Sequence, residues 1–352
     1  MMRHEQYMRR CLQLAEMGMG SVAPNPMVGA VLVYEDRIIG EGYHMQYGQA
    51  HAEVNCIKSV KPEDIGLIEK STLYVSLEPC NHHGKTPPCT ELILQHRIPH
   101  VVSGCRDSFS KVNGAGIQRL KDAGVEVIED VLKKEAAYLN RRFLTFHNER
   151  RPYVILKWAQ TVDGYIGLEG GKPLKISNEM TDRLVHKWRS EESAIMVGTN
   201  TALSDNPALT TRLWPGNNPV RVAIDWDLRL PAESKLLDGS VPTIVINKIR
   251  EEKINNIHYF SIENKSELIP SVMELLYHEQ LITLIIEGGS KLLQSFIDAD
   301  CWDEARVIIN QSIRINRGVA APVLNGHRLI QSNQVDNDEI NLFARIRSNF
   351  SS

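Results

Sequence analysis

The sequence of 352 residues predicts an α/β protein with two domains. In the first half, segments with helical and strand patterns alternate, which is typical of helices that cover a mixed sheet. The length is sufficient for two domains of ordinary size. The charged stretch 148–152 ends in a proline, and a new apolar strand follows it. We therefore expect one domain over residues 1–148 and a second over 149–352.

Each element of the first half follows from its local pattern of apolar residues. The pattern predicts helices over 5–17, from 51, after 89, over 116–123 and over 132–144, and strands over 29–33, 37–40, 72–77, 99–103 and 125–128. The strand over 72–77 delivers Cys80 at its carboxyl end, where α/β sheets usually carry their ligands. After the boundary, strands are expected over 153–157 and 282–286. Gly288 and Gly289 then let the backbone approach a ligand before a helix begins at about Ser290.

Four residues of the first half make up a hydrolytic zinc site. His51, Cys80 and Cys89 supply one imidazole and two thiolates, which leaves a fourth tetrahedral position for water. Glu53 is placed to carry a proton from that water to the leaving amine of a nucleobase. Because residues two apart diverge along a helix, we expect His51 and Glu53 in its first turn, where their side chains can converge.

The remaining cysteines have no spacing typical of metal ligands. Cys11, Cys56, Cys105 and Cys301 are expected in the core, and His82 or His83 could still compete for the zinc. Six scattered cysteines fit a reducing compartment. With no signal region and no apolar run of bilayer length, we expect a cytoplasmic protein without a membrane partner. A net charge of -3 and the lack of a basic tract argue against nucleic acid as a partner.

The loop from Asn81 to Pro88 resembles the signature of the deaminase of bacterial riboflavin biosynthesis, and the likeness extends to residues 24–29 and 42–44. Residues 194–201, 205–212 and 282–290 resemble the reductase fused to that deaminase. The resemblance implies a cytidine-deaminase-like three-layer domain followed by a dihydrofolate-reductase-like domain. It also implies zinc deamination of 2,5-diamino-6-(5-phosphoribosylamino)pyrimidin-4-one, and then reduction of the ribosyl group to ribityl by NADPH.

The resemblance also implies the residues of each site. Contacts with NADPH are expected from Ala159, Lys175, Thr201, Asp205, Gly289, Ser290, Lys291, Leu292, Leu293, Gln294 and Ser295. Contacts with the phosphoribosylated pyrimidine substrates are expected from Asn25, His44, His82, Lys85, Asp107, Pro173, Arg189, Leu209, Arg212 and Glu287. Guanidinium groups suit a phosphate, which supports Arg189 and Arg212 independently. Pro173 and Lys175 stand where many members have Ser and Trp, and Ser108 to Ser110 depart from the usual run after Asp107.

Two alternatives stay open at this point. The first is a different zinc nucleobase deaminase fused to a nucleotide-binding module. The second is a zinc-stabilised scaffold without activity, which needs a fourth protein ligand in place of water. The sequence leaves the oligomeric state open, a homo-oligomer included.

Overall fold

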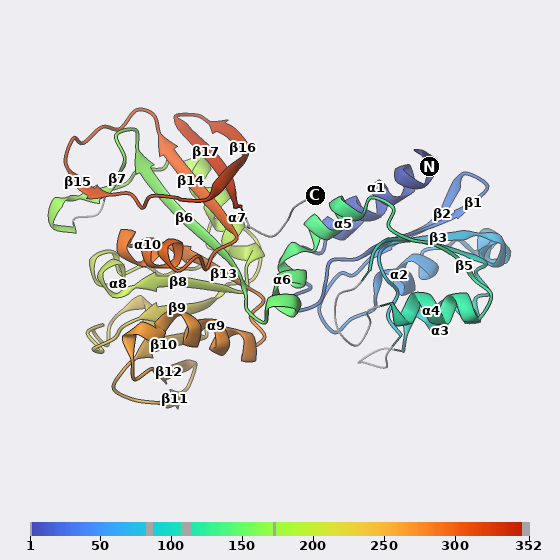
Figure 1. Cartoon of the computed structure of the whole chain (residues 1–352), viewed down its shortest axis with the longest axis horizontal. Helices are drawn as coiled ribbons and strands as arrows, with labels where there is room; N and C mark the ends of the chain where they lie inside the picture. The colour runs from blue at the N-terminus through green and yellow to red at the C-terminus, as the bar shows by residue number, and fades with distance from the viewer. Residues whose placement is uncertain (1, 82–86, 107–113, 172–173, 347–352) are drawn as a thin grey trace. The chain divides into compact units, whose positions relative to one another are not determined.

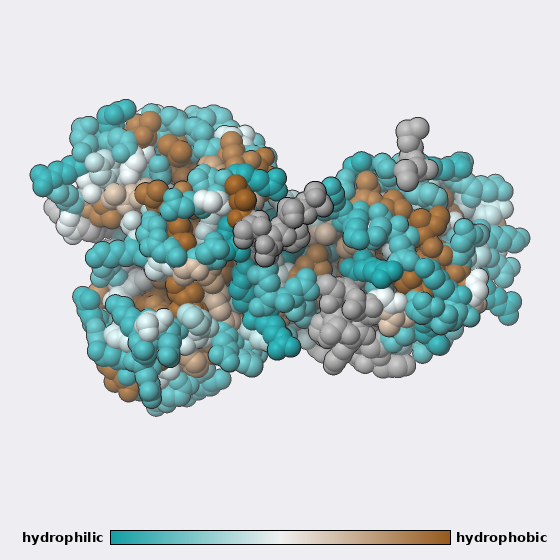
Figure 2. Space-filling view, in the orientation of Figure 1, coloured by the Kyte–Doolittle hydropathy of each residue, from teal (hydrophilic) through white to brown (hydrophobic). Residues whose placement is uncertain are grey.

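The computed structural model describes residues 2–81, 87–106, 114–171 and 174–346. The chain divides into two compact units, Met1–Arg150 and Arg151–Ser352 (Figure 1). The boundary expected between residues 148 and 149 falls at the end of helix α6 (Arg141–Glu149). Among the helices of the described residues, none combines the length and apolar character that crossing a membrane requires. The face drawn in Figure 2 is mostly hydrophilic with scattered apolar patches.

The first unit is built on a mixed sheet of five strands in the order β2-β1-β3-β4-β5. The strands are β1 (Gly29–Tyr34), β2 (Arg37–Tyr43), β3 (Thr72–Leu77), β4 (His100–Cys105) and β5 (Glu126–Ile128). The other helices are α1 (Met2–Glu16), α2 (Ala52–Lys58), α3 (Cys89–Gln95), α4 (Ala115–Asp122), α5 (Lys133–Leu139) and the 3-10 helix η1 (Pro62–Lys70). Strand β1 runs antiparallel to β2 and β3, whereas β3, β4 and β5 are parallel.

Alternate residues of β1 pack into two different cores, which makes this unit a three-layer structure (Figure 1). Ala30 and Leu32 pack with Ala52 and Cys56 of α2. Val31 and Val33 pack on the opposite face with residues of α1. The predicted elements of the first half and the three-layer class are therefore confirmed, with one exception.

The prediction of a single helix over 132–144 is wrong, because the chain forms two helices, α5 and α6, that meet at Asn140. The side chain of Asn140 is buried and bonded to the backbone of Met27, 113 residues earlier. Asn is a preferred residue at helix N-caps, and Asn140 is the N-cap of α6. Its side chain bonds to Met27 and does not cap the helix.

The second unit is built on a ten-stranded sheet in the order β11-β12-β10-β9-β8-β13-β6-β14-β17-β16, with a separate pair β15-β7. The strands are β6 (Tyr153–Thr161), β7 (Tyr165–Leu168), β8 (Ala194–Gly198), β9 (Val220–Ile224), β10 (Thr243–Asn247), β11 (Glu252–Ile254), β12 (Ile257–Ser261), β13 (Thr283–Glu287), β14 (Glu304–Asn310), β15 (Gly318–Ala320), β16 (His327–Val335) and β17 (Asp338–Arg345). The helices are α7 (Glu179–Glu191), α8 (Thr199–Asp205), α9 (Leu268–His278) and α10 (Ser290–Asp298), with 3-10 turns η2 (Glu169–Gly171), η3 (Lys235–Leu237) and η4 (Lys265–Glu267).

Strand β13 runs parallel to both of its neighbours, β6 and β8. The carboxyl ends of these three central strands therefore lie at one edge of the sheet, which is the usual place for a ligand in such sheets. The strands predicted over 153–157 and 282–286 and the helix start at Ser290 are confirmed. Among the residues expected at the reductase site, Thr201, Asp205, Leu209 and Arg212 come after β8, and residues 289–295 come after β13.

Candidate active sites

The three predicted zinc ligands lie together in the first unit. His51 is the N-cap of α2, Cys80 follows β3, and Cys89 opens α3. The Nδ1 atom of His51 lies 3.3 Å from Cys89 Sγ and 3.6 Å from Cys80 Sγ, and all three ligand atoms lie within 4.8 Å of one another. A tetrahedral zinc with Zn–N of about 2.0 Å and Zn–S of about 2.3 Å separates N and S by about 3.6 Å. The residues present thus fit zinc.

Glu53 lies in the first turn of α2, as expected, and is buried beside this cluster. Burial raises the pKa of Glu53, and the charge of Cys80 raises it further. Hydrogen bonds from Cys89 and His51 outweigh burial and lower the pKa of Cys80 to about 4, so Cys80 is a thiolate at neutral pH. In the described residues, no fourth His, Cys, Asp or Glu joins the three ligands. Three protein ligands leave the fourth position of a tetrahedral zinc for a water.

Two predicted substrate residues contact each other next to the zinc ligands. The Nδ1 of His44 lies 3.0 Å from the Ala50 carbonyl, which can only accept, so this nitrogen carries the proton. Its Nε2 then accepts from Asn25 Nδ2 at 3.1 Å. The rings of His44 and His51 pack edge to face with centroids 5.5 Å apart. Burial lowers the pKa of His44, which is therefore neutral at neutral pH.

Four predicted contacts cannot be placed in this way. His82, Lys85, Asp107 and Pro173 lie outside the described residues, as do His83 and Ser108 to Ser110. Their roles remain predictions from the sequence.

In the second unit, two predicted cofactor segments meet at the edge of the sheet. Gly288 and Gly289 follow β13 with φ of 91° and 76°, a backbone region that favours glycine. A Cβ atom on either glycine would lie 3.2 Å from the side chain of Thr201 on α8. Helix α10 then starts at Ser290 without a side-chain cap. Its first N–H groups fit a phosphate of a dinucleotide.

The other predicted cofactor residues divide into two groups. Ala159 on β6, Ser290 and Leu292 are partly exposed, and Lys291, Asp205 and Lys175 are exposed, with Lys175 paired to Asp182 at 3.6 Å. Three further side chains are engaged within the protein: Leu293 is fully buried in the core, Gln294 is bonded to Val323, and Ser295 is bonded to the Leu292 carbonyl. The Leu293 N–H also donates to the Gly289 carbonyl, at 3.1 Å.

Two predicted substrate residues form an ion pair at the same edge of the sheet. Arg189 on α7 donates to both oxygens of Glu287, at 2.8 and 2.6 Å, and donates to the Thr210 carbonyl next to the buried Leu209. Burial raises the pKa of Glu287, but Arg189 and Lys157 outweigh it and lower the pKa to about 2. Glu287 is therefore ionised at neutral pH.

The sequence reasoning missed two residues of this cluster. Lys157 on β6 lies 3.7 Å from Glu287 and is largely buried, and burial lowers its pKa. His186 lies one turn before Arg189, and burial, with Arg189 and the exposed Arg212, lowers its pKa to about 4. A lysine within an otherwise apolar strand was a signal for Lys157. His186 gave no signal beyond its spacing from Arg189.

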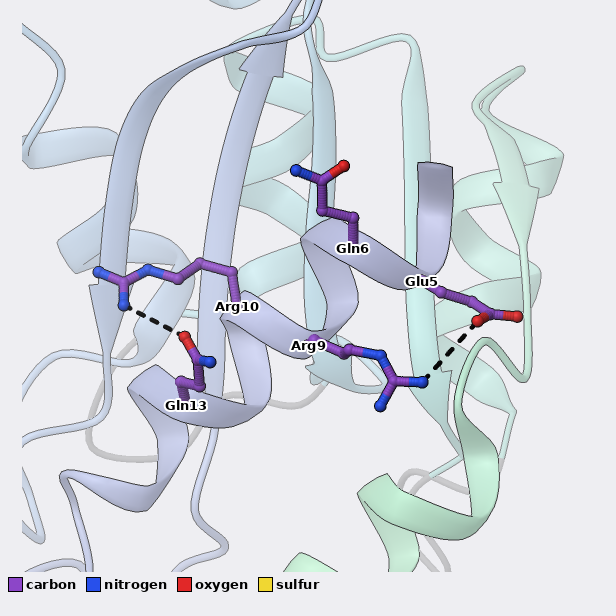
Figure 3. Close-up of a pocket in the computed structure, with 5 residues that line it drawn as sticks. All are labelled: Glu5, Gln6, Arg9, Arg10 and Gln13. Carbon is purple, nitrogen blue, oxygen red and sulfur yellow. Dashed lines mark hydrogen bonds and ion pairs between the residues drawn. The ribbon is translucent and has the colours of Figure 1, made fainter. Parts of the chain in front are cut away.

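A separate hollow lies on the outer surface of α1 (Figure 3). All five lining residues come from that one helix: Glu5, Gln6, Arg9, Arg10 and Gln13. Arg9 pairs with Glu5 at 3.9 Å, and Arg10 pairs with Glu41 at 2.6 Å. None of these residues belongs to either predicted site.

Comparison with known proteins covers both units. The family "Cytidine and deoxycytidylate deaminase zinc-binding region" matches residues 1–105, and the family "RibD C-terminal domain" matches residues 152–313. The "Riboflavin biosynthesis protein RibD" of Aquifex aeolicus is 37% identical over 312 residues, which cover 87% of this chain and 86% of that protein. That of Escherichia coli is 31% identical over 326 residues, with 88% of each chain covered.

Solved structures agree with these matches. The crystal structure of a diaminohydroxyphosphoribosylaminopyrimidine deaminase/5-amino-6-(5-phosphoribosylamino)uracil reductase from Thermotoga maritima superposes with a TM-score of 0.89 at 34% identity, covering 98% of this chain and 99% of that one. RibD of Acinetobacter baumannii also reaches 0.89, at 29% identity and the same coverage.

The match over residues 152–313 excludes the alternative of an unrelated binding module in the second half. The zinc-binding family over residues 1–105 agrees with the three ligands gathered there. The chain therefore belongs to the bifunctional deaminase/reductase family of riboflavin biosynthesis, with a zinc deaminase unit followed by an NADPH-dependent reductase unit.

Proposed function

We propose that the first unit hydrolyses the 2-amino group of 2,5-diamino-6-(5-phosphoribosylamino)pyrimidin-4-one and releases ammonia. The observation that carries this proposal is the cluster of His51, Cys80 and Cys89 with the buried Glu53 beside it. These three residues would hold zinc, which when bound supplies a Lewis acid that lowers the pKa of water. A deaminase of this kind also needs a carboxylate outside the ligand set.

In this proposal Glu53 moves the proton. It accepts a proton from the attacking water and donates it to the amino group as the C–N bond breaks, so atoms and charge balance when ammonia leaves. Burial and the charge of Cys80 raise the pKa of Glu53, which makes its carboxylate a better acceptor for the proton of water. Asn25 and His44 would contact the pyrimidine, and the resemblance assigns His82, Lys85 and Asp107 to the binding of the same substrate.

We propose that the second unit reduces the ribosyl group of the deaminated product, 5-amino-6-(5-phosphoribosylamino)uracil, to a ribityl group. NADPH supplies the hydride when bound. Support comes from the turn of Gly288 and Gly289 that follows β13, against which the side chain of Thr201 packs. The free N–H groups at the start of α10 suit the phosphates of NADPH. Ala159, Lys175 and Asp205 would make further contacts with the cofactor.

Arg189, Arg212 and Glu287 are proposed to bind the substrate of this second step, with Leu209 and Pro173. Both oxygens of Glu287 already accept from Arg189, which fixes the two side chains relative to each other. Arg212 is exposed, so its guanidinium group is the more accessible one for the substrate phosphate. We therefore assign Arg212 the larger share of phosphate binding, and Arg189 the placement of Glu287.

The test gives zinc-loaded protein the diaminopyrimidine substrate and NADPH, and records ammonia release and nicotinamide absorbance separately. Ammonia should appear with or without NADPH, whereas NADPH should be oxidised only after deamination, or at once when the uracil compound is supplied. NADPH oxidation on the undeaminated substrate without ammonia would contradict the proposed order. Release of no ammonia by fully zinc-loaded protein would contradict the proposed deaminase substrate.

A further inference from the structure

The side-chain amide of Asn140 bonds to both backbone groups of Met27, through its oxygen and through its nitrogen. Its Oδ1 accepts from the Met27 N–H at 2.8 Å, and its Nδ2 donates to the Met27 carbonyl at 2.9 Å. The side chain is 1% exposed, so water does not compete for either bond. Both helices continue through this point, since Asn140 N–H donates to Ala136 and its carbonyl accepts from Leu144. The backbone of Asn140 is thus bonded within the two helices, while its side chain is bonded to Met27.

The segment that Asn140 holds leads directly into the deaminase site. The carbonyl of Val28 accepts from the His44 N–H at 2.9 Å, and the Gly29 N–H donates to Ser76 Oγ at 3.1 Å. Asn25 stands two residues before Met27, and its side chain bonds to the ring of His44. Asn140 is therefore a third attachment of this segment, and the one nearest in the chain to Asn25.

Loss of this attachment leaves two buried backbone groups without a partner. Met27 is almost fully buried, and buried N–H and C=O groups in native proteins are nearly always paired. Met27 would have to shift to reach another partner or water. Because Asn25 and Met27 are joined by one proline, Pro26, a shift of Met27 moves Asn25 and its contact with His44.

We propose that Asn140 is a positioning residue for deamination: it fixes the Met27 peptide, and through it Asn25 and His44, without touching the substrate. This inference rests on the proposed role of Asn25 and His44 in binding the pyrimidine. The zinc ligands follow β3 and begin α2 and α3, so they do not depend on the contact with Met27. Loss of the Asn140 side chain should therefore weaken substrate binding while zinc stays bound.

The test is Asn140→Asp in the full chain, which keeps the acceptor for the Met27 N–H and replaces the donor by an oxygen facing the Met27 carbonyl. The deaminase KM should rise on the order of 10-fold, the size expected for an unpaired buried polar group, with a smaller change in kcat. Bound zinc should stay near one per chain. NADPH oxidation with the deaminated substrate should match the wild type, since that site lies in the other unit.

Leu120→Ala serves as the matched control for lost stability. Leu120 on α4 is fully buried in the core of the same unit, and its truncation destabilises without touching Met27. If Leu120→Ala raises the deaminase KM as much as Asn140→Asp does, the effect is one of stability and the inference is overturned. If Asn140→Asp loses zinc, Asn140→Ser, which keeps one hydroxyl for this contact, carries the same KM test.

The outcomes separate this inference from the function on which it rests. A wild type that deaminates, together with an unchanged KM in a zinc-loaded Asn140 variant, overturns the positioning role alone. A zinc-loaded wild type that releases no ammonia overturns the proposed deamination, and the positioning role with it.

Discussion

The ion pair between Glu287 and Arg189 makes a quantitative prediction for Glu287→Gln. Glu287 is 8% exposed, and its pKa falls from the ordinary value of 4.5 to about 2 in the folded protein. At about 1.4 kcal/mol per pKa unit, ionised Glu287 stabilises the second unit by about 3 kcal/mol. The substitution should reduce the free energy of unfolding at pH 7 by about this amount. It leaves Arg189 and Lys157 buried without their anion, a loss of comparable size.

The pH dependence gives the sign of the effect. The folded-state pKa lies below the unfolded one, so the stabilisation is complete above about pH 4.5 and is lost as the pH falls toward 2. The difference between the wild type and Glu287→Gln should therefore be constant from pH 7 to about 5 and shrink below that.

Urea unfolding followed by tryptophan fluorescence measures the free energy of unfolding of the second unit in the full chain, because all five tryptophans lie in that unit. Glu274→Gln on α9 is the control: its side chain is 75% exposed, so its effect should stay within about 0.5 kcal/mol. A Glu287→Gln protein as stable as the wild type at pH 7, or a deficit that does not shrink in acid, would refute the reasoning.

Four further predictions concern the sites and their separation. Glu53→Gln should lower the rate of deamination by at least ~100-fold, which is the low end for loss of a general acid and base, while bound zinc stays near one per chain. Near-normal ammonia release would mean that another group carries the proton. Cys89→Ser should lose zinc and deamination together, because a hydroxyl is a poor zinc ligand, whereas Cys56→Ser, a buried thiol outside the cluster, should keep its zinc. Arg212→Ala should raise the KM of the reductase substrate, by an amount equivalent to about 2 kcal/mol of binding free energy, and leave NADPH affinity unchanged. A defect confined to NADPH binding would contradict the role of Arg212 in binding the substrate phosphate. A fragment of residues 1–150 should release ammonia and 151–352 should oxidise NADPH with the deaminated substrate; activity that returns only on mixing folded fragments would mean that a site is shared.

Features set by neighbouring residues were predictable from the sequence. The apolar runs of β3 and β13, the turn at Gly288 and Gly289, and the start of α10 each follow from a few adjacent residues. The cluster of His51, Cys80 and Cys89 was predictable because each ligand stands at the end of a strand or the beginning of a helix. Short sequence patterns identify such ends well.

Features that depend on distant partners were not predictable. The side chain of Asn140 bonds to Met27, which is 113 residues away. Lys157 stands out in the sequence of β6, but its pairing with Glu287 on the neighbouring strand β13 does not. The side chain of Leu293 packs in the core and that of Gln294 bonds to Val323. A single sequence does not report which of these partners a side chain meets.

The strand order of the second unit determines when its sheet can close during synthesis. Strand β6, the first in the unit, lies between β13 and β14, both of which come near the end of the chain. At about 5–20 residues per second, a ribosome needs on the order of 10 to 30 s to pass from the start of β6 to the end of β14. Until β13 has been made, β6 has two unpaired edges, and until β14 has been made it has one. Unpaired edges of an apolar strand invite association with other nascent chains. The deaminase unit, whose five strands are all complete before residue 150, passes no such stage while the second unit is translated. The longest wait of a strand for its neighbours therefore falls in the synthesis of the second unit.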